Sequence, residues 1–185
     1  MQPYRVWFVQ ELIEKNKRLF IVPVYQRNYN WNYVQCKILY KDIINAFRQD
    51  KKHFTGTIVY IKGHTSSSVL DECMIIDGQQ RITTIFLLLR ALYDLGLAKN
   101  DSIVNELSDY LFNRNCDILY KLKLKPVKGD NCEFEKLMSG NIHELDGSSN
   151  LIRNFKLFEQ LISNSINEGI SLRDILRGMK HLEIV

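Results

Sequence analysis

The segment 75–84, with the sequence IIDGQQRITT, combines side chains that could bind an anion and a metal ion. An apolar strand ends at Asp77 and Gly78, and a helix follows. The free N–H groups and the dipole of a helix start attract anions, and glycine permits the tight bend. Arg81 can donate two parallel hydrogen bonds to a phosphate, and Asp77 could hold Mg²⁺. The segment therefore predicts a phosphate site.

The other polar residues of this segment can complete the site. Gln79 or Gln80 could orient a water molecule, and Thr83 and Thr84 could donate hydroxyl groups from the first helical turn. The alternative is that the acid only caps the helix while the amides and the arginine point into solvent. The Walker A pattern is absent.

A second polar segment, VPVYQRNYNW at 22–31, interleaves three aromatic residues with one arginine and several amides. Tyr25, Gln26 and Arg27 could stack on a base and bind a phosphate. The alternative is that the aromatic residues anchor an irregular loop to the core. Because a Gln-Arg pair occurs in both segments, the two pairs could converge on one polyphosphate.

The stretch 53–59, HFTGTIV, places Gly56 at the start of an apolar strand. Glycine there permits close approach of the backbone, so the stretch could form a wall of the same pocket, or be an ordinary strand start. The four histidines and four cysteines show no ligand spacing, which favours reduced, buried thiols over a zinc site or disulfide framework.

The apolar patterns predict an α+β fold with a small mixed sheet, helices packed around it and a helical C-terminal part. Strands at 56–61 and 69–76 should pair and lead into a helix over 81–96. Other predicted elements before residue 100 are a helix over 5–17, a strand over 19–22 and a helix after Trp31 with a capping box from Asn32 and Gln35.

The second half of the chain has a more helical pattern. The predicted elements are a helix capped by Asp101, a half-exposed strand over 120–125 with outward lysines, a short helix capped by Asp130 and Glu133, a flexible connection over 140–150, a helix over 150–167 and a helix capped by Ser171 and Asp174. The segment 182–185 resembles a strand that stops in mid-pattern, so we expect it to be an unfinished strand or to lack regular pairing, and the natural chain to continue.

Composition excludes several classes of protein. The chain has 185 residues, 45% of them hydrophobic, and a formal net charge of +4, as in ordinary globular domains. No apolar run is long enough to span a membrane and no signal peptide is evident, so we expect a cytoplasmic protein. Ten of the 25 Lys and Arg residues lie in residues 1–60 against four acidic ones, which suits an anionic partner.

Together, VPVYQRNYNW, FTGTIVYI and IIDGQQRITT resemble the N-terminal domain of the GmrSD-type modification-dependent restriction enzymes. The family pattern runs I-P-x-Y-Q-R-x-Y-x-W, then F-x-G-x-I-V, then D-G-Q-Q-R-L-T-T-L. All three blocks occur here in the family's order with conservative changes. A weaker block, Leu122-Lys123-Leu124 followed by Asp130 and Phe134, is similar to the family's L-x-L strand and short helix.

The resemblance implies a core of the ParB/sulfiredoxin type over 1–98, with a mostly helical extension over 99–185. It implies binding and Mg²⁺-dependent hydrolysis of a nucleoside triphosphate, coupled to sensing of modified DNA in anti-phage defence. Carried over, Asp77, Gly78, Gln79, Gln80 and Arg81 would line the phosphates and the metal. Tyr25, Gln26 and Arg27 would lie in the same pocket or beside a DNA-sensing surface.

Two features of the family are missing from this chain. They are a block similar to I-F-E-x-L-N and the HNH nuclease domain common at the family's C-terminus, so we expect no nuclease activity here and a nuclease domain or subunit elsewhere. The alternative function is a DNA-binding module in which the two arginines contact backbone phosphates and the aromatic residues read a base.

Overall fold

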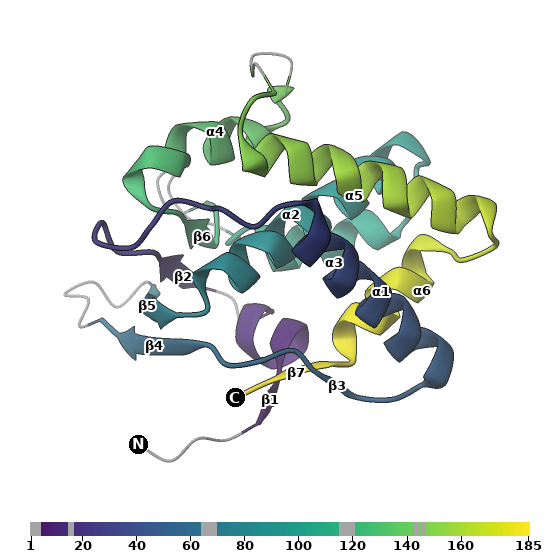
Figure 1. Ribbon diagram of the computed structural model, residues 1–185, viewed down its shortest axis with the longest axis horizontal. Coiled ribbons are helices and arrows are strands. Elements are labelled where there is room, and N and C mark those ends of the chain that lie inside the picture. Colours follow the sequence, from purple (N-terminus) through teal and green to yellow (C-terminus); the bar gives the residue numbers. More distant parts are fainter. Residues whose placement is uncertain (1–4, 15–16, 64–69, 115–120, 143–144, 146) are drawn as a thin grey trace.

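The computed structural model describes residues 5–14, 17–63, 70–114, 121–142, 145 and 147–185 (Figure 1). The strands are β1 (Val6–Trp7), β2 (Arg18–Ile21), β3 (His53–Phe54), β4 (Val59–Lys62), β5 (Asp71–Asp77), β6 (Leu124–Lys125) and β7 (Leu182–Ile184). The helices are the π-helix η1 (Phe8–Ile13), α1 (Tyr33–Gln49), α2 (Gln79–Ala98), α3 (Ile103–Leu111), α4 (Lys128–Ser139), α5 (Asn150–Asn167) and α6 (Leu172–Lys180).

The strands form two mixed sheets. The larger has the order β4-β5-β2-β6, with β4 antiparallel to β5 and the other pairs parallel. The smaller has the order β1-β7-β3, with β1 antiparallel and β3 parallel to β7. In Figure 1 the larger sheet lies at the left and the smaller one along the lower edge. The predicted α+β class is confirmed, while kinship with the ParB type stays a prediction.

The predicted pairing of two strands before a long helix is confirmed. β4 and β5 are antiparallel, and β5 leads through Gly78 into α2. β4 begins at Val59, later than the predicted 56, and Gly56 has a φ of +113°, outside the strand region. This irregular stretch before β4 is the part that reaches the start of α2.

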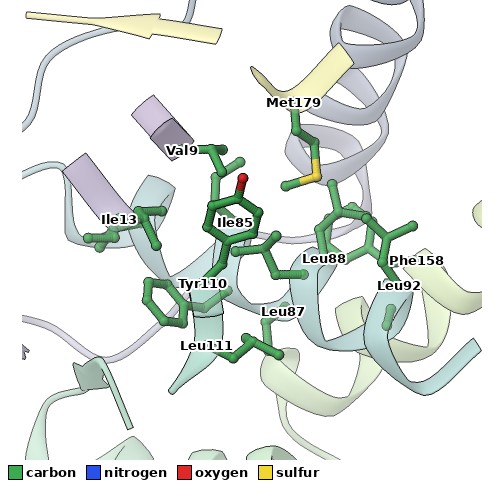
Figure 2. Packing of buried hydrophobic residues seen from close by; sticks show 14 of the residues in the cluster. Val9, Ile13, Ile85, Leu87, Leu88, Leu92, Tyr110, Leu111, Phe158 and Met179 are labelled. Atoms are coloured by element: carbon green, nitrogen blue, oxygen red, sulfur yellow. The ribbon is translucent and has the colours of Figure 1, made fainter. Parts of the chain in front are cut away.

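Helix α2 is the centre of the core. It is buried along most of its length because it packs against both α3 and α5. Figure 2 shows Ile85, Leu88 and Leu92 of α2 among side chains from η1, α3, α5 and α6. A helix that is apolar on nearly every side is expected in such an interior position. The start of α2 is thereby fixed relative to the rest of the fold.

Two terminal predictions were only partly right. The segment predicted as a helix over 5–17 is β1 followed by η1, because Val6 and Trp7 pair with Ile184 and Glu183. The segment 182–185, predicted to be an unfinished strand or to lack regular pairing, contains β7, a buried strand that pairs on both sides. Both errors have one cause: the partners lie far apart in sequence, so no local pattern reveals the pairing.

The prediction of outward lysines over 120–125 was also wrong for Lys123, which has no exposed surface. Its Nζ donates hydrogen bonds to the carbonyls of Ile13, Glu14 and Asp109 at 3.0, 3.2 and 2.5 Å. Ile13 and Asp109 belong to the last turns of η1 and α3, and Glu14 directly follows η1. An ammonium group can be buried there because all three of its donors are used.

The capping predictions have mixed outcomes. The boxes of Asn32 with Gln35 and Ser171 with Asp174 are confirmed, and the Asp101 carboxylate accepts from the N–H of Ile103. The box of Asp130 with Glu133 was wrong, because α4 begins earlier, at Lys128, and Asp130 bonds another segment. A helix over 150–167 is confirmed as α5, and the predicted connection over 140–150 lies partly outside the described residues.

The hydrophobic core is shared by both halves of the chain. It runs from Phe8 to Ile184, and each sheet takes one strand from the second half. The predicted boundary after residue 98 lies inside this core, between α2 and α3, and stays a prediction.

Of the described cysteines, Cys36 and Cys73 are buried thiols and Cys132 is an exposed one. None of the described helices could cross a membrane.

Candidate functional site

A cavity of about 570 Å³ lies where β5, the start of α2, the 22–31 segment and the stretch before β4 meet. It is lined by Gln26, Arg27, Trp31, Gly56, Thr57, Asp77, Gly78, Gln79, Gln80 and Arg81. The tertiary structure thus brings both Gln-Arg pairs and the glycine of the third motif to one cavity. The predicted convergence of these motifs is present in the structure.

The start of α2 opens into this cavity. Gly78 is the N-cap residue, with a φ of +90° that favours glycine, and it has no side chain to bind the first N–H groups of the helix. A Cβ at this position would lie 2.8 Å from the carbonyl oxygen of Thr57. Glycine therefore permits both the bend and the close contact with the stretch before β4, and it leaves the positive end of the helix open.

The guanidinium of Arg81 is held against the part of the cavity wall that Gly56 and Thr57 form. Its Nη1 donates a hydrogen bond of 2.8 Å to the carbonyl of Thr57. A Cβ on Gly56 would lie 2.5 Å from Nη2 of Arg81, so a larger residue there would displace the guanidinium from this position. Burial lowers the pKa of Arg81 and the nearby Asp77 carboxylate partly offsets this shift. A half-buried cation with a single protein acceptor among the described residues favours an anionic ligand.

Arg27 and Gln79 have no protein partner for their side chains in the part of the chain that the structure describes. Gln79 is only 8% exposed, yet its amide makes no hydrogen bond there. The amide atoms of Gln79 are not fully enclosed, so the group opens onto the cavity and is free to bind a ligand or a water molecule. Arg27, by contrast, is exposed at the rim.

Asp77 provides the cavity with one exposed carboxylate that has no ion pair or hydrogen bond among the described residues. The same residues contain no group of three or more His, Cys, Asp or Glu that could hold a metal. Mg²⁺ is often held by one or two carboxylates together with substrate phosphates. A single carboxylate beside an anion site fits that mode of binding and does not fit a metal site made by protein ligands alone.

Gln80 and Gln26 hold the 22–31 segment in place. The Oε1 of Gln80 accepts from the N–H groups of Asn30 and Trp31 at 2.8 and 3.3 Å, and its Nε2 donates to the carbonyl of Asn28 at 3.1 Å. The Nε2 of Gln26 donates to the carbonyl of Ile76 at 2.9 Å. Of the two amides predicted to orient water, Gln79 is therefore the one whose amide remains free.

Three predicted site residues do not line this cavity. Thr84 is fully buried, where its hydroxyl bonds the Tyr29 hydroxyl at 2.8 Å and donates to the carbonyl of Gln80 at 2.7 Å. Thr83 lines a smaller neighbouring cavity. Tyr25 is 69% exposed and is not among the residues that line the cavity. Because α2 begins at Gln79, both threonines lie in its second turn and not in the first, which places them away from the larger cavity.

The aromatic residues of the 22–31 segment have separate positions. Tyr29 is buried and anchors the segment to the core, as the alternative interpretation of these aromatic residues predicts. Burial raises its pKa. Trp31 lines the cavity instead. Thr57, whose carbonyl holds Arg81, was not predicted, because a backbone acceptor has no sequence signature.

The profile of the family described as "GmrSD restriction endonuclease, N-terminal domain" matches residues 9–184. The chain belongs to this family. The GmrSD N-terminal domain is part of a restriction system, so this chain is a component of such a defence system. No curated protein matches the chain.

Proposed function

We propose that this GmrSD N-terminal domain binds a nucleoside triphosphate with Mg²⁺ in the cavity and hydrolyses it, as the regulatory part of a restriction system. The observation that carries the proposal is the convergence of Arg27, Arg81 and the start of α2 on one cavity. The partnerless amide of Gln79 is a second feature that favours a ligand there.

Charge balance supports a polyphosphate. A helix start supplies only about half an elementary charge, which cannot balance a triphosphate. Arg27 and Arg81 add two positive charges, and Asp77 supplies one negative charge that a divalent cation would match. Bound Mg²⁺ would supply charge stabilisation of the phosphate oxygens, with Asp77 as its protein ligand.

The chain's own residues suit the hydrolytic step. Gln79 can orient a water molecule through its free amide, as glutamine does in some nucleotide hydrolases. The water oxygen attacks the γ-phosphorus, the β–γ bridging P–O bond breaks, and inorganic phosphate leaves with the water's proton released to solvent. Arg81, held by Thr57, and Arg27 would stabilise the charge on the transferred group.

Calorimetric titration with the four ribonucleoside triphosphates, with and without Mg²⁺, tests the proposal. We expect binding that depends on Mg²⁺, phosphate release, and loss of hydrolysis in Gln79→Ala with binding largely kept. Lys99→Ala, at the far end of α2, is the control and should bind as the parent does. No binding of any nucleotide would contradict the proposal.

The salt dependence of the binding affinity distinguishes this function from the DNA-binding alternative. A DNA module should lose affinity steeply as salt rises, because binding releases counterions. An enclosed nucleotide site should depend more on Mg²⁺ than on salt. Sensing of modified DNA and cleavage by a nuclease located elsewhere are parts of the proposal for the whole system.

A further inference from the structure

The carboxylate of Asp130, on the first turn of α4, contacts the segment that carries Arg27. Its Oδ2 accepts a hydrogen bond of 2.6 Å from the N–H of Tyr29, two residues after the arginine. Asp130 is about 100 residues away in sequence. It therefore brings the second half of the chain to the edge of the candidate site.

A second contact joins α4 to the same segment. A Cβ on Gly129 would lie 2.8 Å from Nδ2 and 2.9 Å from Oδ1 of Asn28, so the Asn28 side chain packs directly on the helix backbone. Asn28 and Tyr29 are the two residues that follow Arg27. The first turn of α4 thus fixes the backbone immediately after the arginine from two adjacent positions.

Asp130 also shares a small cavity with Arg27 and Gln79. This cavity of about 10 Å³ lies beside the larger one, and Gln79, Gln80 and Arg27 line both. Its size is near the minimum for one water molecule. The carboxylate therefore lies near the arginine without forming an ion pair with it among the described residues.

Arg27 depends on its backbone for its position, because its side chain has no protein acceptor in the described part of the chain. Arg81 is different, since the Thr57 carbonyl holds its guanidinium directly. We propose that Asp130 is a positioning residue for Arg27: through the Tyr29 N–H it holds the segment in the conformation that presents this arginine to the anion. This inference rests on the proposed nucleotide site.

A double-mutant cycle tests the proposal. We expect Asp130→Ala to weaken Mg²⁺-nucleotide binding about tenfold, the effect of losing one charge-assisted hydrogen bond. Asp130→Asn keeps an oxygen acceptor and should restore most of the affinity. Glu135→Ala, an exposed carboxylate of the same helix, is the matched control and should have no effect.

The cycle then asks through which arginine Asp130 acts. If it acts through Arg27, Arg27→Ala/Asp130→Ala should bind no more weakly than Arg27→Ala alone. The effects of Asp130→Ala and Arg81→Ala should instead be additive. Additivity with Arg27, or no effect of Asp130→Ala on affinity, would overturn the proposal.

Hydrogen exchange separates this inference from the proposed function. In the absence of nucleotide, the amides of residues 28–31 should exchange faster in Asp130→Ala than in the parent or in Glu135→Ala, with melting temperatures compared as a check on folding. If the parent binds no nucleotide, the proposed function fails, while faster exchange still supports anchoring of the segment. Unchanged exchange overturns the positioning role whatever the binding result.

Discussion

The two Gln-Arg pairs of this chain have the same sequence, and in both the glutamine binds protein while the arginine lines the cavity. Gln26 donates a hydrogen bond to the carbonyl of Ile76, which lies just before the second pair. Gln80 hydrogen-bonds the backbone of the 22–31 segment, which carries the first pair. The arginines differ, however. Arg81 lies against Gly56 with its guanidinium fixed by Thr57, whereas Arg27 lies exposed at the rim and has no acceptor among the described residues.

The difference suggests two roles for two identical side chains. A fixed guanidinium is preorganised, so it loses little conformational entropy when an anion binds. An exposed arginine loses more, and its position depends on the segment that carries it. The motif predicts that both arginines are present in the site, but the surrounding backbone decides which one is preorganised.

The largest expected effect is that of removing Arg81. Arg81→Ala should weaken nucleotide binding by about 1.5–3 kcal/mol, the range for hydrogen bonds to charged groups. It should also lower the free energy of unfolding by about 1 kcal/mol, because the bond to Thr57 is lost. Arg27→Ala should weaken binding in the same direction and leave stability unchanged. Calorimetry and urea denaturation measure the two effects; equal stability losses would contradict the comparison.

The two glutamines should differ in stability. Gln80→Ala removes three hydrogen bonds from a residue that is 7% exposed and should cost about 2–3 kcal/mol. Gln26→Ala removes one and should cost about 1 kcal/mol. Gln79→Ala, which removes none, is the internal control. If all three variants unfold at the same urea concentration, Gln80 does not hold the segment as described.

A comparison of substitutions at two glycines tests the contact between Gly56 and Arg81. Gly56 and Gly169 both have positive φ, but a Cβ on Gly169 would contact nothing within 4 Å. Alanine at either position should cost about 1–2 kcal/mol of stability from the left-handed backbone. Only Gly56→Ala should also weaken nucleotide binding, by about tenfold, since it displaces the preorganised guanidinium. Equal nucleotide affinities of the two variants would show that the contact between Gly56 and Arg81 does not affect binding.

Lys123 is a third cation to compare with the two arginines, because protein carbonyls accept hydrogen bonds from all three N–H groups of its ammonium. Burial lowers its pKa to about 8, which Asp109 only partly offsets, while the unfolded value is about 10.4. Between these values the unfolded chain binds more protons, so this residue's contribution to stability rises with pH. From pH 8 to 9 the gain is about 1 kcal/mol.

Lys123→Met lacks this titration. Urea denaturation at both pH values should therefore show the stability of the parent rising relative to the variant by about 1 kcal/mol. The cysteines and tyrosines that also titrate in alkali are common to both proteins and cancel in the difference. Parallel pH profiles would mean that Lys123 titrates alike in the folded and unfolded states.

The sequence by itself determined the chemistry and much of the local structure. The bend at Asp77-Gly78, the uncapped start of α2 and two capping boxes follow from residue types and their spacing over a few positions. These features depend on contacts between near neighbours in the chain. The family could also be predicted, because its blocks are short runs of sequence, whereas the tertiary structure brings these blocks to one cavity.

The tertiary structure alone decided which residues of each motif bind protein and which keep free side chains in the cavity. Gln79 and Gln80 are adjacent and chemically identical, yet only Gln80 reaches the 22–31 segment. Lys123 appeared to belong to an exposed alternation, but the carbonyls left free near the ends of η1 and α3 surround it. In each case the partner is a backbone group distant in sequence, and backbone groups are the same in every residue, so no pattern of side chains can reveal them.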